Sequence, residues 1–256
     1  DYVTKPFQFE EVYARVQTHL NLRRLEILRD DLTHMVIHDL RNPLTVIFGL
    51  LEVLETQEAP KLSASTRNFV ALARHSAEDL LNMIGSILDV SKLNAGEMSL
   101  HREPCDLGAL IRAILASAPP LPGNRTATLD APAAPLIVEV DGALIRRVLQ
   151  NLLSNALKHT PSGGDVRIAV THSAGEIRVA VTDAGPGIAQ EHHQLIFEKF
   201  GQVEDPNSRT GTGLGLTFCK LAIGVHGGRI GVESEIGKGS TFWFTLPLPN
   251  NSPAAT

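Results

Sequence analysis

The sequence predicts an α+β protein in two parts: a helical hairpin that forms a dimeric four-helix bundle, followed by an α/β sandwich. Three observations lead to this prediction. Residues 9–93 hold two long stretches with helical apolar spacing, and residues after 100 alternate between short strand patterns and helical patterns. The apolar content of 43% in 256 residues is ordinary for a folded chain with one large or two modest domains.

The first predicted helix covers residues 9 to about 57. Within it Leu25, Leu28, Leu32 and Met35 follow one another at intervals of 3, 4 and 3, and charged residues flank them. This spacing is that of a narrow coiled-coil seam, which favours pairing with the same helix of a second chain. A single amphipathic helix that packs on its own domain is the alternative.

A second predicted helix covers about residues 63–93, after a break at Pro60, and the turn residues 94–97 end it. Its apolar positions are Phe69, Leu72, Leu80, Met83, Ile84, Ile87 and Leu88. Two long helices with a short connection predict an antiparallel hairpin. Two such hairpins in a dimer bury both apolar faces at once, as a four-helix bundle.

The second half of the chain is predicted to contain short strands and four helices. The expected strands are 98–102, 125–129, 136–140, 165–171, 177–183, 229–234 and 241–246. The expected helices are 107–117, 142–159, 190–200 and 214–226. Strands flanked by several helices indicate an α/β sandwich, and we expect residues 250–256 to be disordered.

Composition argues against several classes of function. The net charge is −5 and the basic residues are scattered, so no nucleic-acid partner is expected. Cys105 and Cys219 have no metal-binding spacing, and we expect both to be reduced and structural. No apolar stretch approaches the ~20 residues of a membrane span, and the first residues have no signal-peptide pattern. We therefore expect a soluble, cytoplasmic chain without a membrane segment.

A histidine with an acidic neighbour and a downstream proline lies inside the first predicted helix. Pro43 removes one helical hydrogen bond and loosens the carbonyl of Asp39, so we expect a bend near His38. Asp39 is placed to take a proton from the imidazole or to hold its tautomer. An imidazole with a carboxylate neighbour is a competent nucleophile for phosphoryl transfer, although most of the ten histidines are expected to be ordinary surface residues.

Three polar residues share one face of the helix predicted at 142–159. Asn151, Asn155 and Lys158 are at positions i, i+4 and i+7, while leucines and an alanine cover the other faces. Amide oxygens suit Mg²⁺, and a lysine adds a positive charge for phosphate. Polar residues that merely face solvent are the alternative interpretation of this spacing.

Two glycine clusters follow. Asp183, Gly185 and Gly187 come directly after a predicted strand, and Gly211, Gly213 and Gly215 open a predicted helix. Neither cluster matches a dinucleotide-binding fingerprint or a P-loop. Glycines allow backbone N–H groups to approach phosphate closely, and Asp183 is able to accept a hydrogen bond from an amine such as that of adenine. Ordinary turns are the alternative for each cluster alone.

Residues 35–44 (Met-Val-Ile-His-Asp-Leu-Arg-Asn-Pro-Leu) resemble the H-box in the dimerisation and phosphoacceptor domain of two-component histidine kinases. The resemblance implies that His38 is the phosphoacceptor and Asp39 its base. Asn42 lies four residues after His38 on the same helical face. It matches the residue that in many members orients a water for dephosphorylation of the partner, so phosphatase activity is a further expectation.

The later motifs are similar, in this order, to the N, G1, F and G2 boxes of the histidine kinase ATP-binding domain, a Bergerat-type ATPase. Phe197 and Phe200 stand for the F box, and residues 201–212 for a nucleotide lid. The resemblance implies that ATP is bound by Asn151, Asn155, Lys158, Asp183, Gly185, Gly187, Phe197, Phe200, Gly211, Gly213 and Gly215. It also implies that Asn155 holds Mg²⁺ and that Asp183 reads adenine.

One departure concerns the lid. Gln202 stands where many relatives have an arginine that reaches the γ-phosphate, and Arg209 is a candidate replacement.

Residues 1–22 resemble the last strand, loop and helix of a receiver domain, with Lys5 and Pro6 at the matching positions. The resemblances predict four parts: a receiver remnant with a connecting helix at 1–22, a dimerisation and histidine phosphotransfer domain at 23–97, a catalytic ATP-binding domain at 98–249, and the tail at 250–256. A change in an upstream receiver is expected to act on His38 through this helix.

Three functions compete. The first is a homodimeric autokinase that loads His38 from ATP and passes the phosphoryl group to an aspartate of a response-regulator receiver domain. The second is a hydrolytic or conformational ATPase of the same superfamily, which carries a glutamate as base for water where Asn151 stands. Because an amide cannot accept a proton, transfer to histidine is favoured over hydrolysis. The third is a dimeric scaffold or net phosphatase, and the intact motifs count against a non-catalytic chain.

Overall fold

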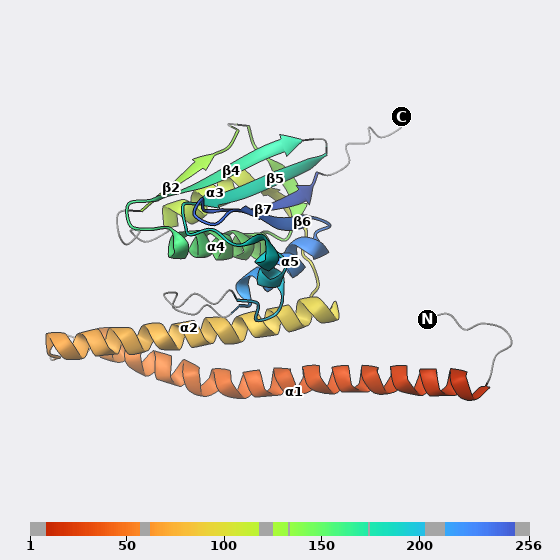
Figure 1. The fold of residues 1–256 in the computed structure, drawn as a ribbon. Coiled ribbons are helices and arrows are strands. Elements are labelled where there is room, and N and C mark those ends of the chain that lie inside the picture. The colour runs from red at the N-terminus through yellow and green to blue at the C-terminus, as the bar shows by residue number, and fades with distance from the viewer. Residues whose placement is uncertain are drawn as a thin grey trace. The chain divides into compact units, whose positions relative to one another are not determined.

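The computed structural model describes residues 9–56, 62–117, 125–132, 134–173, 175–202 and 213–248. Two compact units divide the chain, Asp1–Ser91 and Lys92–Thr256, and each is described by itself. The predicted α+β class, a helical hairpin followed by an α/β sandwich, is confirmed (Figure 1). Lys5, Pro6, Arg209, Gly211 and the tail at 250–256 lie outside the described residues.

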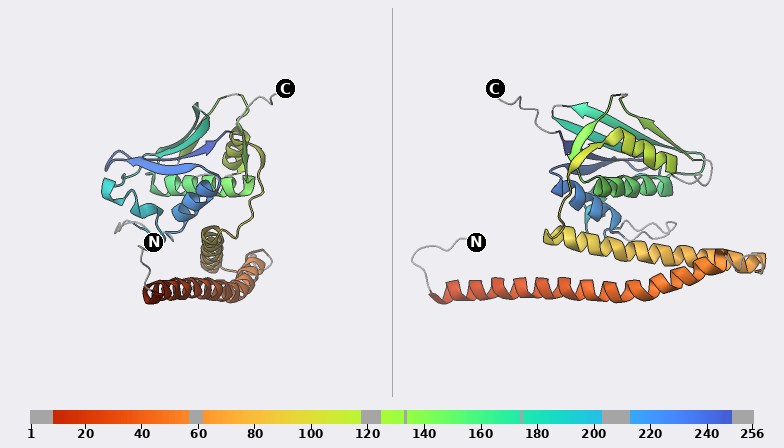
Figure 2. Two further views of the ribbon diagram at one scale, coloured as in Figure 1. Left: turned by 90° about the vertical axis from the view of Figure 1, so that its right-hand side faces the viewer. Right: turned by 180° about the vertical axis from the view of Figure 1, so that it is seen from behind.

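The hairpin consists of two long helices, α1 (Phe9–Thr56) and α2 (Ala64–Ala95). Helix α1 continues through Pro43, and it bends in its C-terminal half (Figure 2). A proline leaves one helical carbonyl without its usual donor, which permits such a bend. Across the hairpin, Arg74 and Glu55 form an ion pair at 2.5 Å. No helix within the described ranges is both long enough and apolar enough to cross a membrane.

After α2, the described part of the second unit contains two sheets, three α-helices and two 3-10 turns. Its elements are β1 (Glu103–Asp106), α3 (Leu107–Ser117), β2 (Thr126–Asp130), β3 (Ile137–Val140), α4 (Gly142–His159), β4 (Asp165–Ser173), β5 (Glu176–Asp183), η2 (Gln190–His192), η3 (Leu195–Phe197), α5 (Gly215–Val225), β6 (Arg229–Ser234) and β7 (Ser240–Pro247). The larger sheet has the strand order β2-β4-β5-β7-β6, and β1 pairs with β3 separately.

Alternation along the strands decides which face of the large sheet meets the helices. In β5 the buried apolar residues are Ile177, Val179 and Val181, and in β7 they are Phe242, Phe244 and Leu246. Because successive side chains in a strand point to opposite faces, all six lie on one side. Helices α4 and α5 cover that side (Figure 2), so the core lies between the sheet and these helices.

The prediction of a strand at 98–102 is wrong, since the first strand begins at Glu103. The backbone N–H of His101 instead donates to the Asp141 carboxylate at 3.3 Å. The Arg102 guanidinium donates to the Val225 carbonyl at 2.8 Å. The segment is therefore held by side-chain and helix-end groups instead of a sheet neighbour, which an apolar pattern does not reveal.

The helix expected at 190–200 is also wrong, because two 3-10 turns, η2 and η3, replace it. In η3 the buried residues are the adjacent Ile196 and Phe197. Adjacent residues do not form the i, i+4 stripe that stabilises a short helix against a core. Phe200 follows with a φ of +63°, which ends any helical path.

Candidate functional site

Helix α4 presents the polar row predicted from its spacing. The Asp141 carboxylate caps the helix by accepting from two backbone N–H groups of the first turn, at 3.1 Å each. The buried stripe of the helix consists of Ile145, Val148, Leu149, Leu152, Leu153 and Ala156. Burial of this stripe sets the rotation of the helix, which leaves Asn151 and Asn155 half-buried and Lys158 exposed.

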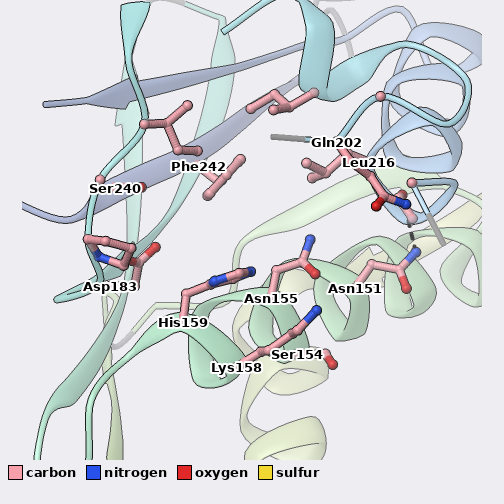
Figure 3. A pocket seen from close by; sticks show the side chains of 17 residues that line it. Asn151, Ser154, Asn155, Lys158, His159, Asp183, Gln202, Leu216, Ser240 and Phe242 are labelled. Carbon is pink, nitrogen blue, oxygen red and sulfur yellow. Dashed lines mark hydrogen bonds between the residues drawn. The ribbon is translucent and has the colours of Figure 1, made fainter. Parts of the chain in front are cut away.

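The polar row of α4 lines a pocket of about 420 Å³. The loop after β5, the start of α5 and the first residues of β7 line it as well. The structure brings seven of the predicted site residues into this pocket: Asn151, Asn155, Lys158, Asp183, Gly187, Gly213 and Gly215. In Figure 3 the side chains of α4 form a row, with Asn151 at one end and His159 near Asp183 at the other. The pocket thus has an amide-rich end and a carboxylate end.

Asp183 is the buried acid of the site, with 5% of its surface exposed. One carboxylate oxygen accepts from the Gly185 backbone N–H at 2.8 Å. Burial raises the pKa of the Asp183 carboxyl, while the N–H groups of Gly185 and Ser240 and the nearby His159 oppose the rise. The remaining lone pairs are available for a ligand donor at this end of the pocket.

Gly187 forms part of the pocket wall at a place where no side chain fits. Its φ is +75°, and a Cβ there would lie 2.0 Å from the Glu235 carbonyl oxygen. Two hydrogen bonds hold the loop on either side: Gly237 N donates to Pro186 O at 2.7 Å, and Ile188 N donates to Ser234 Oγ at 2.8 Å. The loop after β5 is therefore fastened to the turn between β6 and β7.

Gly213 closes the other side of the pocket. Its φ is +67°, and a Cβ there would lie 2.7 Å from the Phe200 Cα. The Phe200 N–H donates to the Gly213 carbonyl at 3.2 Å. In addition, Thr217 Oγ1 donates to the Glu198 carbonyl at 2.9 Å. These bonds bring residues 198–202 next to the start of α5, and Gln202 lines the pocket.

Among the described residues predicted to bind ATP, three do not line the pocket. Phe197 is buried behind it and meets the ring of Phe242 edge-on, with centroids 6.5 Å apart. Phe200 is 64% exposed. Gly185 lies against Asp183 and the end of α4, since a Cβ there would be 2.7 Å from Asp183 Oδ1. Phe197 thus contacts Phe242, and Gly185 contacts Asp183, both of which line the pocket.

The pocket also contains residues that sequence reasoning missed, among them His159, Ile188, Ile196, Leu216, Ser240 and Phe242. His159 follows Lys158 and is four residues after Asn155, so helical spacing was a usable signal for it. Ser240 and Phe242 enter because β7 pairs with β5, with Ser240 opposite Asp183. Nothing in the local sequence indicates that pairing.

The motif predicted to accept phosphate lies in the other unit. His38, Asp39 and Asn42 are within α1, and the side chains of Asp39 and Asn42 are exposed. Exposure suits residues that must meet a second reactant.

Two known domain families match the chain. Residues 28–96 match the "His Kinase A (phospho-acceptor) domain", and residues 140–250 match the "Histidine kinase-, DNA gyrase B-, and HSP90-like ATPase" family. The chain is 37% identical over 253 residues to "Sensor histidine kinase TmoS" of Ectopseudomonas mendocina, which covers 97% of the chain and 25% of that protein.

Two solved structures are similar over most of the chain. Full-length ShkA in complex with AMPPNP has a TM-score of 0.70 and 30% identity, covering 85% of this chain and 45% of that one. Histidine kinase ThkA in complex with response regulator protein TrrA has a TM-score of 0.60 and 27% identity, covering 98% and 69%. The chain spans a quarter of TmoS and under half of ShkA. With a phospho-acceptor domain and a histidine kinase-like ATPase domain in this order, the chain belongs to the histidine kinase family.

Proposed function

We propose that this chain is an ATP-dependent histidine autokinase of a two-component system, which phosphorylates His38 and passes the phosphoryl group to an aspartate of a response regulator. One observation carries the proposal. A single pocket combines the amide and lysine row of α4 with a buried carboxylate at its far end, in a chain that also carries the phospho-acceptor motif. ATP has matching chemistry, an amine-bearing base at one end and phosphates at the other.

Adenine occupies the carboxylate end in this proposal. Asp183 accepts from the exocyclic amine, while Ile188, Ile196 and Phe242 supply apolar walls for the base. Phosphates lie toward Lys158 and the start of α5, where backbone N–H groups at a helix N-terminus attract anions. Gly213 and Gly215 line the pocket there, and their lack of side chains permits close approach of the phosphates.

Mg²⁺ fits beside the phosphates. Within the described ranges, no cluster of three or more His, Cys, Asp or Glu side chains is placed to hold a metal. Mg²⁺ does not need such a cluster, because it keeps several waters and binds through one or two protein oxygens plus substrate phosphates. Asn155, half-buried in the pocket, offers such an oxygen. When bound, Mg²⁺ neutralises phosphate charge during transfer.

The pocket supports transfer to histidine over hydrolysis. Asp183 is the one acidic side chain among the described lining residues, and it lies at the adenine end. The amide of Asn151, which donates to the Gly215 carbonyl at 3.4 Å, is no base for water. His38 supplies the nucleophile instead. Its ring nitrogen attacks the γ-phosphorus, the bond to the leaving ADP oxygen breaks, and Asp39 accepts or holds the proton of the other ring nitrogen.

The hairpin supports a homodimer. Large apolar residues are exposed along it: Leu40, Val46, Ile47, Leu50, Val53 and Leu54 on α1, and Phe69, Leu72 and Leu80 on α2. Many exposed apolar residues on one hairpin favour an interaction site, and two hairpins would cover them as a four-helix bundle. The similar ThkA is in complex with a response regulator. We assign the same class of partner here, and Asn42 is the candidate for orienting water in a phosphatase reaction.

The predicted division at 1–22, 23–97, 98–249 and 250–256 is part of this proposal. Helix α1 is continuous from Phe9 to Thr56, so a rotation introduced by a receiver domain ahead of it reaches His38 without a break.

Radiolabelled ATP with Mg²⁺ tests the autokinase directly. We expect an acid-labile, base-stable phosphoprotein, because phosphohistidine has those properties. His38→Gln loses the label and keeps its affinity for nucleotide. His34→Gln, one helical turn earlier on α1, is the matched control and keeps the label. Label that persists in His38→Gln overturns the assignment. Phosphotransfer to a panel of receiver domains then identifies the partner.

The metal assignment has a separate test. Asn155→Asp places a negative side chain beside the phosphates, so we expect weaker binding of the ATP analogue AMPPNP with Mg²⁺ and little autophosphorylation. Gln150→Ala, at an exposed position on α4 outside the pocket lining, is the control. Unchanged turnover in Asn155→Asp contradicts the role of Asn155.

A further inference from the structure

A buried histidine lies at the C-terminal end of α5, away from the pocket. His226 has 2% of its surface exposed, and both ring nitrogens are engaged. Nε2 accepts from the Asp141 backbone N–H at 2.9 Å, and Nδ1–H donates to the Ala222 carbonyl at 2.6 Å. A backbone N–H only donates and a carbonyl only accepts, so these two partners require the neutral ring with its proton on Nδ1.

The same place holds the segment that leads from α2 into the second unit. The Asp141 carboxylate, which caps α4, also accepts from the His101 backbone N–H at 3.3 Å. The Arg102 guanidinium donates to the Val225 carbonyl at 2.8 Å, at the negative end of α5. These bonds form one cluster, which we call the latch. It consists of His101, Arg102, Asp141, Val225 and His226.

The latch joins the two helices that line the nucleotide pocket. Asn151 is about 15 Å along α4 from Asp141, at 1.5 Å per residue, and the start of α5 lies a similar distance from His226. Helices transmit a displacement at one end to the other because their own hydrogen bonds hold them rigid. We propose that His226 is a positioning residue of the nucleotide site: with Asp141 it fastens residues 101–102 to α4 and α5, and its protonation releases that fastening.

Protonation acts through geometry. A proton on Nε2 would face the Asp141 N–H, so two donors would meet and the bond would be lost. Burial lowers the pKa of His226 from 6.5; the bond to Ala222 opposes the shift, Arg102 adds to it, and the Asp141 carboxylate opposes it. Since the folded-state pKa lies below the unfolded value, the stability contributed by the neutral ring is complete above about pH 6.5 and falls as pH decreases below it.

The proposal rests on the proposed nucleotide site, so its test needs a readout that does not depend on nucleotide. Amide hydrogen exchange of the full chain at residues 98–106 and 151–159 reports on the linking segment and the pocket helix separately. His226→Leu removes the acceptor, and His226→Gln keeps an acceptor that does not titrate. Arg102→Ala breaks the latch from its exposed side, which avoids a buried substitution. His172→Gln and Arg112→Ala are exposed controls on β4 and α3.

At pH 7.5, we expect His226→Leu and Arg102→Ala to exchange faster at both segments and to bind AMPPNP at least about fivefold more weakly, the lower end of typical couplings between sites. His226→Gln and both controls should match the unsubstituted chain. Intrinsic amide exchange slows as pH falls, so the two pH values are compared as protection factors. Lowering the pH to 5.5 should reduce the protection factors of both segments in the unsubstituted chain but not in His226→Gln.

Exchange in Arg102→Ala and His226→Leu within about twofold of the unsubstituted chain at both segments overturns the proposal, as does equal pH dependence in His226→Gln. If His226→Leu does not fold, Arg102→Ala and His226→Gln still decide the question. Failure of the unsubstituted chain to bind AMPPNP at all contradicts the proposed function instead, while the exchange data still judge the latch.

Discussion

Gly187 and Gly237 form a matched pair for testing how the pocket wall is built. Both have a positive φ, +75° and +81°, so a side chain at either position costs about 1–2 kcal/mol for the left-handed backbone. A Cβ on Gly237 meets nothing within 4 Å. A Cβ on Gly187 would lie 2.0 Å from the Glu235 carbonyl oxygen.

Gly187→Ala therefore carries a second cost. A carbon and a carbonyl oxygen approach no closer than about 3.3 Å, so the two groups must separate by about 1.3 Å. Overpacking of this kind costs about 1–3 kcal/mol. We expect losses in unfolding free energy of about 1–2 kcal/mol for Gly237→Ala and about 2–5 kcal/mol for Gly187→Ala.

Thermal unfolding followed by circular dichroism measures the difference. At about 2–4 °C per kcal/mol for a domain of this size, the midpoint should fall by about 2–8 °C for Gly237→Ala and about 4–20 °C for Gly187→Ala. AMPPNP affinity, measured by calorimetry, should fall in Gly187→Ala alone, since Gly187 lines the pocket. Equal losses of stability in the two variants would refute the reasoning, because the Glu235 contact would then impose no constraint.

Three further predictions concern binding, stability and assembly. Asp183→Asn should weaken AMPPNP binding at least about tenfold, since a hydrogen bond to a charged group contributes about 1.5–3 kcal/mol. It should not lower the unfolding free energy at pH 7, because burial raises the pKa of this carboxyl and so penalises its ionised form in the folded state. The advantage of the neutral amide over the carboxylate disappears below pH 3.8, where the carboxyl is protonated in both states. Gly231→Val should lower stability by about 1–3 kcal/mol in thermal unfolding without affecting AMPPNP binding, because its Cβ would lie 2.6 Å from the Trp243 ring. Leu50→Glu, which places a charge on the exposed apolar face of α1, should convert dimers to monomers in light scattering, whereas Glu52→Gln should not.

Helices α3 and α4 could be predicted closely because their signals are local. The bounds of α3 and α4 agree with the expected 107–117 and 142–159. In α4 a capping aspartate, Asp141, precedes a stripe of buried residues at helical spacing, and both signals lie within 18 residues. The same spacing placed Asn151, Asn155 and Lys158 on one face, and they line one pocket.

Elements held by distant groups could not be predicted in the same way. Residues 98–102 are fastened by bonds to Asp141, 40 residues away, and to Val225, 123 residues away. An apolar pattern that suits a strand does not distinguish a sheet neighbour from a helix end. The segment at 190–200 failed for a related reason, because only tertiary packing decided that Ile196 and Phe197 would be the residues buried there.

By itself, the sequence determined the α+β class, the order of the motifs and the chemical character of the pocket, because amide, lysine and carboxylate groups keep their chemistry wherever they lie. Only the tertiary structure decided which of these groups meet. It brought Ser240 and Phe242 beside Asp183 through the pairing of β5 with β7, and it set His226 against Asp141 across 85 residues. The physical reason is range: spacing along a helix or strand is a local property, whereas contacts between elements depend on how all the buried faces pack together.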